Sequence, residues 1–178
     1  AELAVNCAGQ GRFTGRGMPV GAHHLLVDEI AGAIADHAGA PDDLRAWVSL
    51  DALTHDLREG LTHDVTPFLK RRHPGLAADE RRAAGAVDRL LGVRAPPAAQ
   101  AIVHRADVMV REVEAVALWG YPLEDVPWDR AVLGDMSRWS GRVAAYQERG
   151  RPGLIREWTE RLGSALAQVG APWYQEGT

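Results

Sequence analysis

The residue types best suited to chemistry are concentrated in residues 52–70, which read Ala-Leu-Thr-His-Asp-Leu-Arg-Glu-Gly-Leu-Thr-His-Asp-Val-Thr-Pro-Phe-Leu-Lys. The pair His55-Asp56 is followed by Glu59, Asp64 and Lys70. Imidazole nitrogen and carboxylate oxygen together suit Mn, Fe, Co or Zn. If this part of the chain is helical, Glu59 lies one turn from His55 on the same face. A metal held by His55 and Asp56 would then have a carboxylate beside it, which predicts metal-assisted hydrolysis.

A less specific interpretation of these residues is the solvated, charged end of an amphipathic helix. His-Asp dipeptides are common by chance. The run Lys70-Arg71-Arg72 can likewise be read as dipole complementation at a helix C-terminus, or, beside a metal-carboxylate cluster, as a phosphate contact from Lys70. Residues in other parts of the chain are needed to distinguish these interpretations.

The elements that position these groups follow from the spacing of apolar residues. Helices are predicted at about 22–37, 42–59, 67–72, 77–91, 98–119, 129–149 and 153–169. His23 and His24 open the first of them, and the second ends in the His-Asp pair. No strand pattern of convincing length is present, so we expect an all-α fold, a single-domain helical bundle over residues 1–178.

The helix predicted at 98–119 carries acidic residues in its apolar face. Asp107 lies next to a core position, and Glu114 follows seven residues later on the same face. A carboxylate among core residues needs a partner, and a metal ion and a buried arginine are equally reasonable. The apolar stripe of this helix comprises Ile102, Val103, Ala106, Val110, Val113 and Ala117.

Composition narrows the class of protein. Of 178 residues, 46% are hydrophobic and 25% charged, with a net charge of −4, which gives no reason to expect nucleic-acid or membrane binding. The single cysteine, Cys7, excludes a disulfide framework and a thiolate-rich zinc site and fits a reducing compartment. No apolar run of membrane-spanning length and no signal peptide is recognisable, so we expect a cytoplasmic protein.

The glycine-rich segment 6–22 carries Arg12 and Arg16, and a glycine-rich loop with arginines can approach phosphate closely. It lacks the Gly-Lys-Ser/Thr of a nucleotide P-loop, and taken alone it predicts a flexible loop.

Three stretches together resemble the HD-domain phosphohydrolases. They are Val-Gly-Ala-His-His-Leu-Leu-Val at 20–27, residues 52–70 quoted above, and His-Arg-Ala-Asp at 104–107. The chain is most similar to the small branch that contains the bacterial 5'-deoxynucleotidases and the phage dATP triphosphohydrolases. The resemblance covers about residues 11–120, and helices at about 129–170 follow this motif-bearing part.

The resemblance implies a role for each matching residue. His23, His55, Asp56 and Asp107 would be the metal ligands, and Glu59 and Asp64 the catalytic carboxylates. Lys70 would contact phosphate, and Arg12 with Phe13 would line the nucleotide pocket. His24 stands where the family usually has serine, so both histidines are candidates for the first ligand. Arg58 replaces a small residue and adds a cation that could engage a phosphate.

The expected function is therefore divalent-metal-dependent hydrolysis of 2'-deoxynucleotides. The reaction would be dNTP to nucleoside plus triphosphate, with dATP a candidate, or dNMP to nucleoside plus phosphate, and the ion Mn, Co, Zn, Fe or Mg. The alternative is a catalytically inactive module that binds a metal or nucleotide. Resemblance to the family and the six tryptophans of the chain further predict a homo-oligomer.

Overall fold

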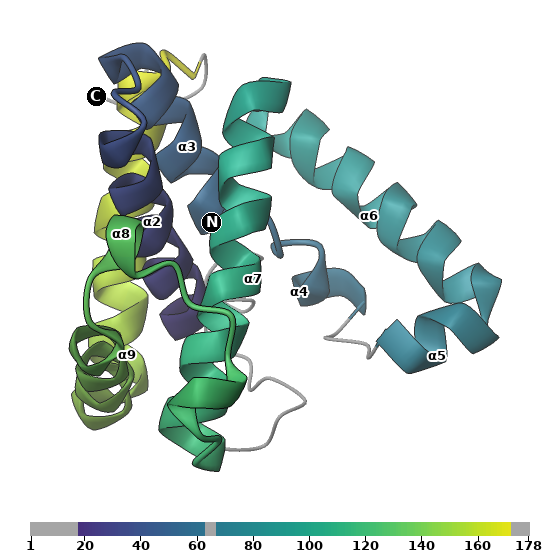
Figure 1. Ribbon diagram of the computed structural model, residues 1–178. Coiled ribbons are helices and arrows are strands. Elements are labelled where there is room, and N and C mark those ends of the chain that lie inside the picture. The colour runs from purple at the N-terminus through teal and green to yellow at the C-terminus, as the bar shows by residue number, and fades with distance from the viewer. Residues whose placement is uncertain (1–17, 63–66, 172–178) are drawn as a thin grey trace.

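The computed structural model describes residues 18–62 and 67–171, which form helices and no strand (Figure 1). The all-α prediction is confirmed. The elements are α2 (Val20–His37), α3 (Asp42–Thr54), α4 (Glu59–Thr62), α5 (Pro67–Arg72), α6 (Pro74–Leu91), α7 (Pro97–Trp119), the 3-10 turn η1 (Leu123–Asp125), α8 (Arg130–Leu133) and α9 (Met136–Gln168).

Proline and glycine account for most helix ends. Pro41 and Pro96 precede α3 and α7 in extended conformation, and Pro97 occupies the first turn of α7, where its missing N–H costs no hydrogen bond. At the other end of α7, Gly120 adopts a left-handed conformation with φ 70°, and its N–H bonds to the last turn of the helix. These local signals explain why the predicted bounds of α2, α5, α6 and α7 agree with the structure to within a few residues.

The core lies among α2, α3, α7 and α9, which all pack against one another. Of the 18 residues of α2, twelve are buried, so this helix is enclosed by the other three. In Figure 1, α6 diverges from α7, α4 lies between them, and α5 lies at the end of α6 that is far from α7. Only Ala83 and Val87 are buried in α6. The bundle is therefore dense around α2 and open on the side of α6.

In the C-terminal half of the chain, two details of the predicted helices are wrong. The stripe of α7 does not extend to Ala117, which is exposed, whereas its neighbours Val116 and Leu118 pack against the core. The helix expected at 129–149 is divided into α8 and the first half of α9, which starts at Met136. The break expected before the helix at 153–169 is confirmed, because Gly150 interrupts α9 with φ 70° and ψ 163°. Gly150 sustains this conformation because it lacks a Cβ.

A network of ion pairs between α2 and α9 was not predicted from the sequence. Glu29 accepts hydrogen bonds from Arg142 Nε (2.8 Å), Tyr146 Oη (2.6 Å) and Arg161 Nη2 (3.0 Å). Burial raises the pKa of Glu29, but the hydrogen bonds of Arg142 and Tyr146 and the charge of Arg142 lower it further, to below its usual value. For the adjacent Asp28, burial prevails and raises the pKa. The network holds α2 against both halves of α9.

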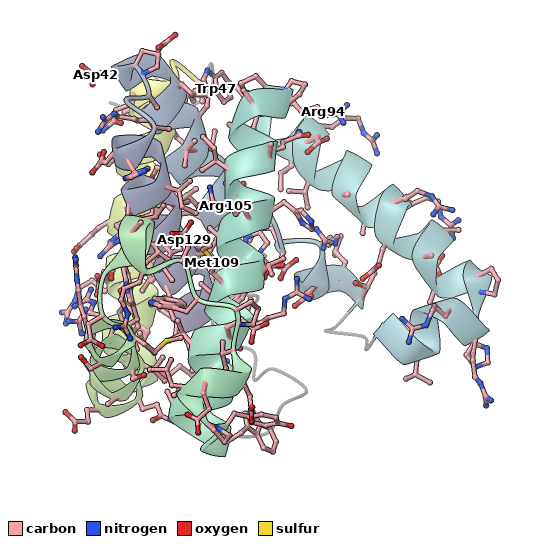
Figure 2. The ribbon with its side chains drawn as sticks, in the orientation of Figure 1. Asp42, Trp47, Arg94, Arg105, Met109 and Asp129 are labelled. Carbon is pink, nitrogen blue, oxygen red and sulfur yellow. The ribbon has the colours of Figure 1, made fainter. Side chains whose placement is uncertain are left out.

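A separate ion pair fixes the segment before α8. Arg105 Nη2 on α7 donates to Asp129 Oδ2 at 2.6 Å, and Figure 2 shows the two side chains next to each other. Asp129 also caps α8 by accepting a hydrogen bond from the N–H of Val132. Within the described part of the chain, no helix is both long enough and apolar enough to cross a membrane.

Candidate metal centre

Three core helices bring the predicted metal ligands together. His23 lies in the first turns of α2, His55 and Asp56 directly follow α3, and Asp107 lies in the middle of α7. Leu25, Leu26, Leu53 and Ala106, beside these positions in the chain, are completely buried. Because the ligand positions are adjacent to core residues, packing of the three helices also determines the geometry of the site.

The helix that was expected to continue to Glu59 ends at Thr54. Residues 55–58 form turns in which Leu57 N–H bonds to Thr54 O (2.9 Å) and Glu59 N–H to Asp56 O (2.8 Å). These are i to i+3 bonds, tighter than those of an α-helix. His55 and Glu59 are therefore not related by a regular α-helical turn, and the shared helix face that was expected for a helical segment is not formed.

The ligand atoms converge at short distances. His23 Nε2 lies 3.2 Å from Asp107 Oδ1 and 4.0 Å from Asp56 Oδ2, and His55 Nε2 lies 3.3 Å from Asp56 Oδ2. The side chain of His23 is fully buried, and those of His55 and Asp56 are 14% and 12% exposed. All four residues predicted as ligands thus contribute to one buried cluster.

The hydrogen bonds of the two imidazoles define which nitrogen faces the cluster. His55 Nδ1 donates to the carbonyl oxygen of Ala52 at 2.8 Å, and His23 Nδ1 donates to Glu114 Oε1 at 2.9 Å. With Nδ1 donating in this way, a neutral ring directs the lone pair of its Nε2 toward the carboxylates. Both Nε2 atoms are buried and make no hydrogen bond within the described residues. Buried lone pairs that face carboxylate oxygens repel them unless positive charge lies between.

The pKa values reflect the same demand for positive charge. Burial lowers the pKa of His55, but the charge and proximity of Asp56, with a contribution from Asp107, raise it to about 9. Burial raises the pKa of Asp107, yet His23, His55 and Arg111 lower it to about 2. The pKa of Asp56 is also held well below its usual value, mainly by His55 and Arg58 against the effect of burial.

Geometry alone yields two sets of three residues that could hold a metal ion within the described part of the chain. One is His23, His55 and Asp107, and the other is His24, His55 and Asp56. In each set the ligand atoms lie within 4.8 Å of one another. The buried His and Asp groups therefore fit a divalent ion, as the ligand types predicted.

No family model, curated protein or solved structure matches this chain.

Glu114 is the residue whose role the sequence indicated least clearly. It lies two turns after Asp107 on α7 and is 4% exposed, and its carboxylate faces His23 rather than the centre of the cluster. Carboxylates in this position orient metal-binding imidazoles and increase their basicity. The seven-residue spacing from Asp107 was the available signal, since it places both residues on one helix face.

The other predicted site residues differ in how far the structure describes them. Glu59 begins α4 and is 5% exposed. Arg58 Nη2 donates to Asp56 Oδ1 at 2.8 Å, so this cation pairs with a candidate ligand. Arg12, Phe13 and Asp64 lie outside the described residues, and of Lys70 only the backbone, in α5, is described.

A cavity of about 260 Å³ borders the cluster on the side of α6. The candidate ligand His55 lines it together with Arg58, and α6 and the segment at Arg94 that leads to α7 line it as well. Figure 2 labels Arg94 at the end of α6. The lining combines apolar side chains with hydrogen-bonding groups: Leu50, Val87, Leu91, Asp51, Asp88 and Gln100. A small polar molecule could therefore bind next to His55.

Proposed function

We propose that this protein is a divalent-metal-dependent phosphohydrolase that acts on 2'-deoxynucleotides. The ion would be held by His23, His55, Asp56 and Asp107. The observation that carries the proposal is the convergence of these side chains, distant in sequence, into one buried cluster with unbonded Nε2 atoms on His23 and His55. Without an ion, a proton on Nε2 would have to supply the positive charge between an imidazole and these carboxylates, as the raised pKa of His55 indicates, and a divalent ion would supply that charge in its place.

A divalent ion in this cluster would polarise a phosphoryl oxygen as a Lewis acid. Neighbouring side chains would transfer the proton of the attacking water and supply positive charge for the phosphate. The carboxylate of Glu59 would take the proton of the attacking water, because Glu59 is buried in the turn that directly follows Asp56. Arg58 would contribute positive charge for the phosphate, in addition to its contact with Asp56.

The cavity beside His55 supports the nucleotide part of the proposal. It has apolar walls from Leu50 and Val87 and hydrogen-bonding groups from Asp51 and Gln100, a combination suited to a sugar or base. The preference for deoxynucleotides over other phosphate esters comes from the resemblance of the motifs to the HD-domain deoxynucleotidases.

The test uses purified protein that has been stripped with a chelator and resupplied with Mn, Co, Zn or Mg. Deoxynucleoside mono-, di- and triphosphates, with the matching ribonucleotides, are incubated with each form, and phosphate is separated from triphosphate by ion-exchange chromatography. We expect ion-dependent release of one of these products from a deoxynucleotide. The reaction should be lost in Asp107→Asn and retained in His37→Ala, which alters an exposed histidine at the far end of α2.

The inactive binding module gives a different result in the same experiment. It would bind the ion, and nucleotide by calorimetry, without turnover of any member of the panel. That outcome would refute the enzymatic proposal while leaving the metal centre in place.

We propose further that the enzyme is a homo-oligomer. Trp119 and Tyr121, at the end of α7, are 45% and 58% exposed, and aromatic residues are enriched in interfaces. Sedimentation of the purified chain at micromolar concentration should give a mass above 19.3 kDa. A monomer throughout this range would exclude a stable oligomer.

A further inference from the structure

His24 is a buried histidine directly beside the candidate ligands. It follows His23 on α2 and has no exposed surface. Its ring centroid lies 5.0 Å from that of His55 and 6.2 Å from that of Trp158. The Nε1–H of Trp158 donates to the carbonyl oxygen of Leu53 and is therefore not the group that faces His24. Trp158 thus packs beside the His24 ring, which lies next to His55.

The two possible ligand sets of the cluster overlap at His55. One contains His23 and Asp107, and the other contains His24 and Asp56. His55 has one nitrogen available for an ion, because its Nδ1 donates to Ala52 O. A single imidazole lone pair binds one ion. The two sets therefore cannot be filled by two ions at once through His55.

We propose that His24 is a third imidazole ligand of a single ion at this centre, and that it makes the site selective for ions that accept nitrogen donors. The inference rests on the metal-dependent function proposed above and specifies the ion. Mg²⁺ and Ca²⁺ prefer oxygen donors, whereas Zn²⁺, Co²⁺, Ni²⁺ and Fe²⁺ bind imidazole well. Each imidazole added to the carboxylates of Asp56 and Asp107 shifts the preference toward this second group.

Burial makes the contribution of His24 specific. A surface histidine can rotate away from an ion, but the His24 ring is enclosed by His55 and Trp158 and has no exposed surface. Little additional ordering is needed when it binds, so less conformational entropy is lost. His24 thereby contributes to ion selectivity with little loss of conformational entropy on binding.

The test measures metal binding directly and does not depend on turnover. Chelator-treated wild type, His24→Ser and His24→Gln are titrated with Co²⁺, and the visible d–d absorption reports the number and type of donors. Competition with a chromophoric chelator gives the affinity for Zn²⁺, and calorimetry gives the affinity for Mg²⁺. His37→Ser, at the exposed end of α2, is the matched control. Circular dichroism in chelator shows whether each variant is folded, and His24→Gln preserves most of the volume if His24→Ser does not fold.

We expect one ion per chain in the wild type. Both His24 variants should change the Co²⁺ spectrum and weaken Zn²⁺ binding by at least about tenfold, the lower bound for disturbing the surroundings of a bound metal. Mg²⁺ binding should change much less, and the control should match the wild type.

Folded His24 variants with the Co²⁺ spectrum and Zn²⁺ affinity of the wild type would overturn the inference, and His24 would then be a packing residue. Two ions per wild-type chain would overturn the single shared centre. These outcomes leave the proposed hydrolase intact. A wild type that binds no ion at all would instead refute both the inference and the metal-dependent function.

Discussion

Removal of Glu114 tests how much the orientation of the His23 ring contributes to metal affinity, because the candidate ligand His23 itself is left in place. Glu114 Oε1 accepts a hydrogen bond from His23 Nδ1 at 2.9 Å, and the two side chains are 5% and 0% exposed. Hydrogen bonds to charged groups contribute about 1.5–3 kcal/mol. Residues that orient metal-binding imidazoles affect affinity by about 10–100-fold, which corresponds to about 1.4–2.7 kcal/mol. The two ranges agree, so we expect Glu114→Ala to weaken Zn²⁺ binding by about 10–100-fold.

Glu114→Gln provides an internal comparison. The amide oxygen of glutamine can still accept the Nδ1–H of His23, so the tautomer is retained while the negative charge is lost. The loss of affinity should therefore be smaller than in Glu114→Ala. Glu112→Ala is the control, because residue 112 lies two positions earlier on α7 and points about 200° away around the helix.

Zn²⁺ affinity is measured by competition with a chromophoric chelator at constant pH, since ligand protonation competes with the ion. The melting temperature in excess chelator shows whether a variant is merely less stable. Equal Zn²⁺ affinity for Glu114→Ala and wild type would refute the argument that Glu114 orients His23 for a metal.

Three further predictions concern other features. Glu29→Gln should lower Tm by roughly 3–12 °C, from about 1.5–3 kcal/mol at about 2–4 °C per kcal/mol, while the exposed Glu160→Gln should not. Folding lowers the pKa of Glu29, so the stabilisation by its carboxylate is present above an unfolded pKa of about 4.3 and is lost as pH falls through the lower folded value. The difference in Tm between wild type and Glu29→Gln should therefore shrink in acid, and a difference that stays constant with pH would contradict this. Gly150→Ala should lower the free energy of unfolding, measured in urea, by about 1–3 kcal/mol, whereas Gly141→Ala, in a helical part of α9, should raise it slightly. A Gly150→Ala variant more stable than Gly141→Ala would contradict this prediction. Glu59→Gln should retain the ion and slow hydrolysis by about 10²–10⁴-fold, and turnover at the wild-type rate would exclude Glu59 as the base.

The positions of the helices could be predicted from the sequence because their ends carry local signals. Pro41, Pro97 and Gly120 act through backbone geometry that depends little on the rest of the chain. The end of α3 at Thr54 has no such signal. There the turns over residues 55–58 place His55 and Asp56 against α2 and α7, so tertiary contacts override the helical pattern.

The candidate site could be predicted only for residues whose chemical type is typical of metal ligands. His23, His55, Asp56 and Asp107 were identified in advance, and the structure brings them together. The contact of Glu114 with His23 spans 91 positions in the chain, and a helical pattern gives no information about such pairs. The Glu29 network is similar, because its partner Arg142 lies 113 positions away.

The uneven packing of α6 has a consequence for how the protein opens. Helix α6 has two buried residues, packs mainly against the short helices α4 and α5, and exposes Leu90 by 62%. Segments with few buried contacts open at a lower free energy than the global unfolding of the protein. Backbone amides of α6 should therefore exchange with deuterium well before those of α2. Since α6 forms one wall of the cavity beside His55, such local opening would expose the cavity to solvent while α2, α3 and α7 keep the histidines and aspartates in register.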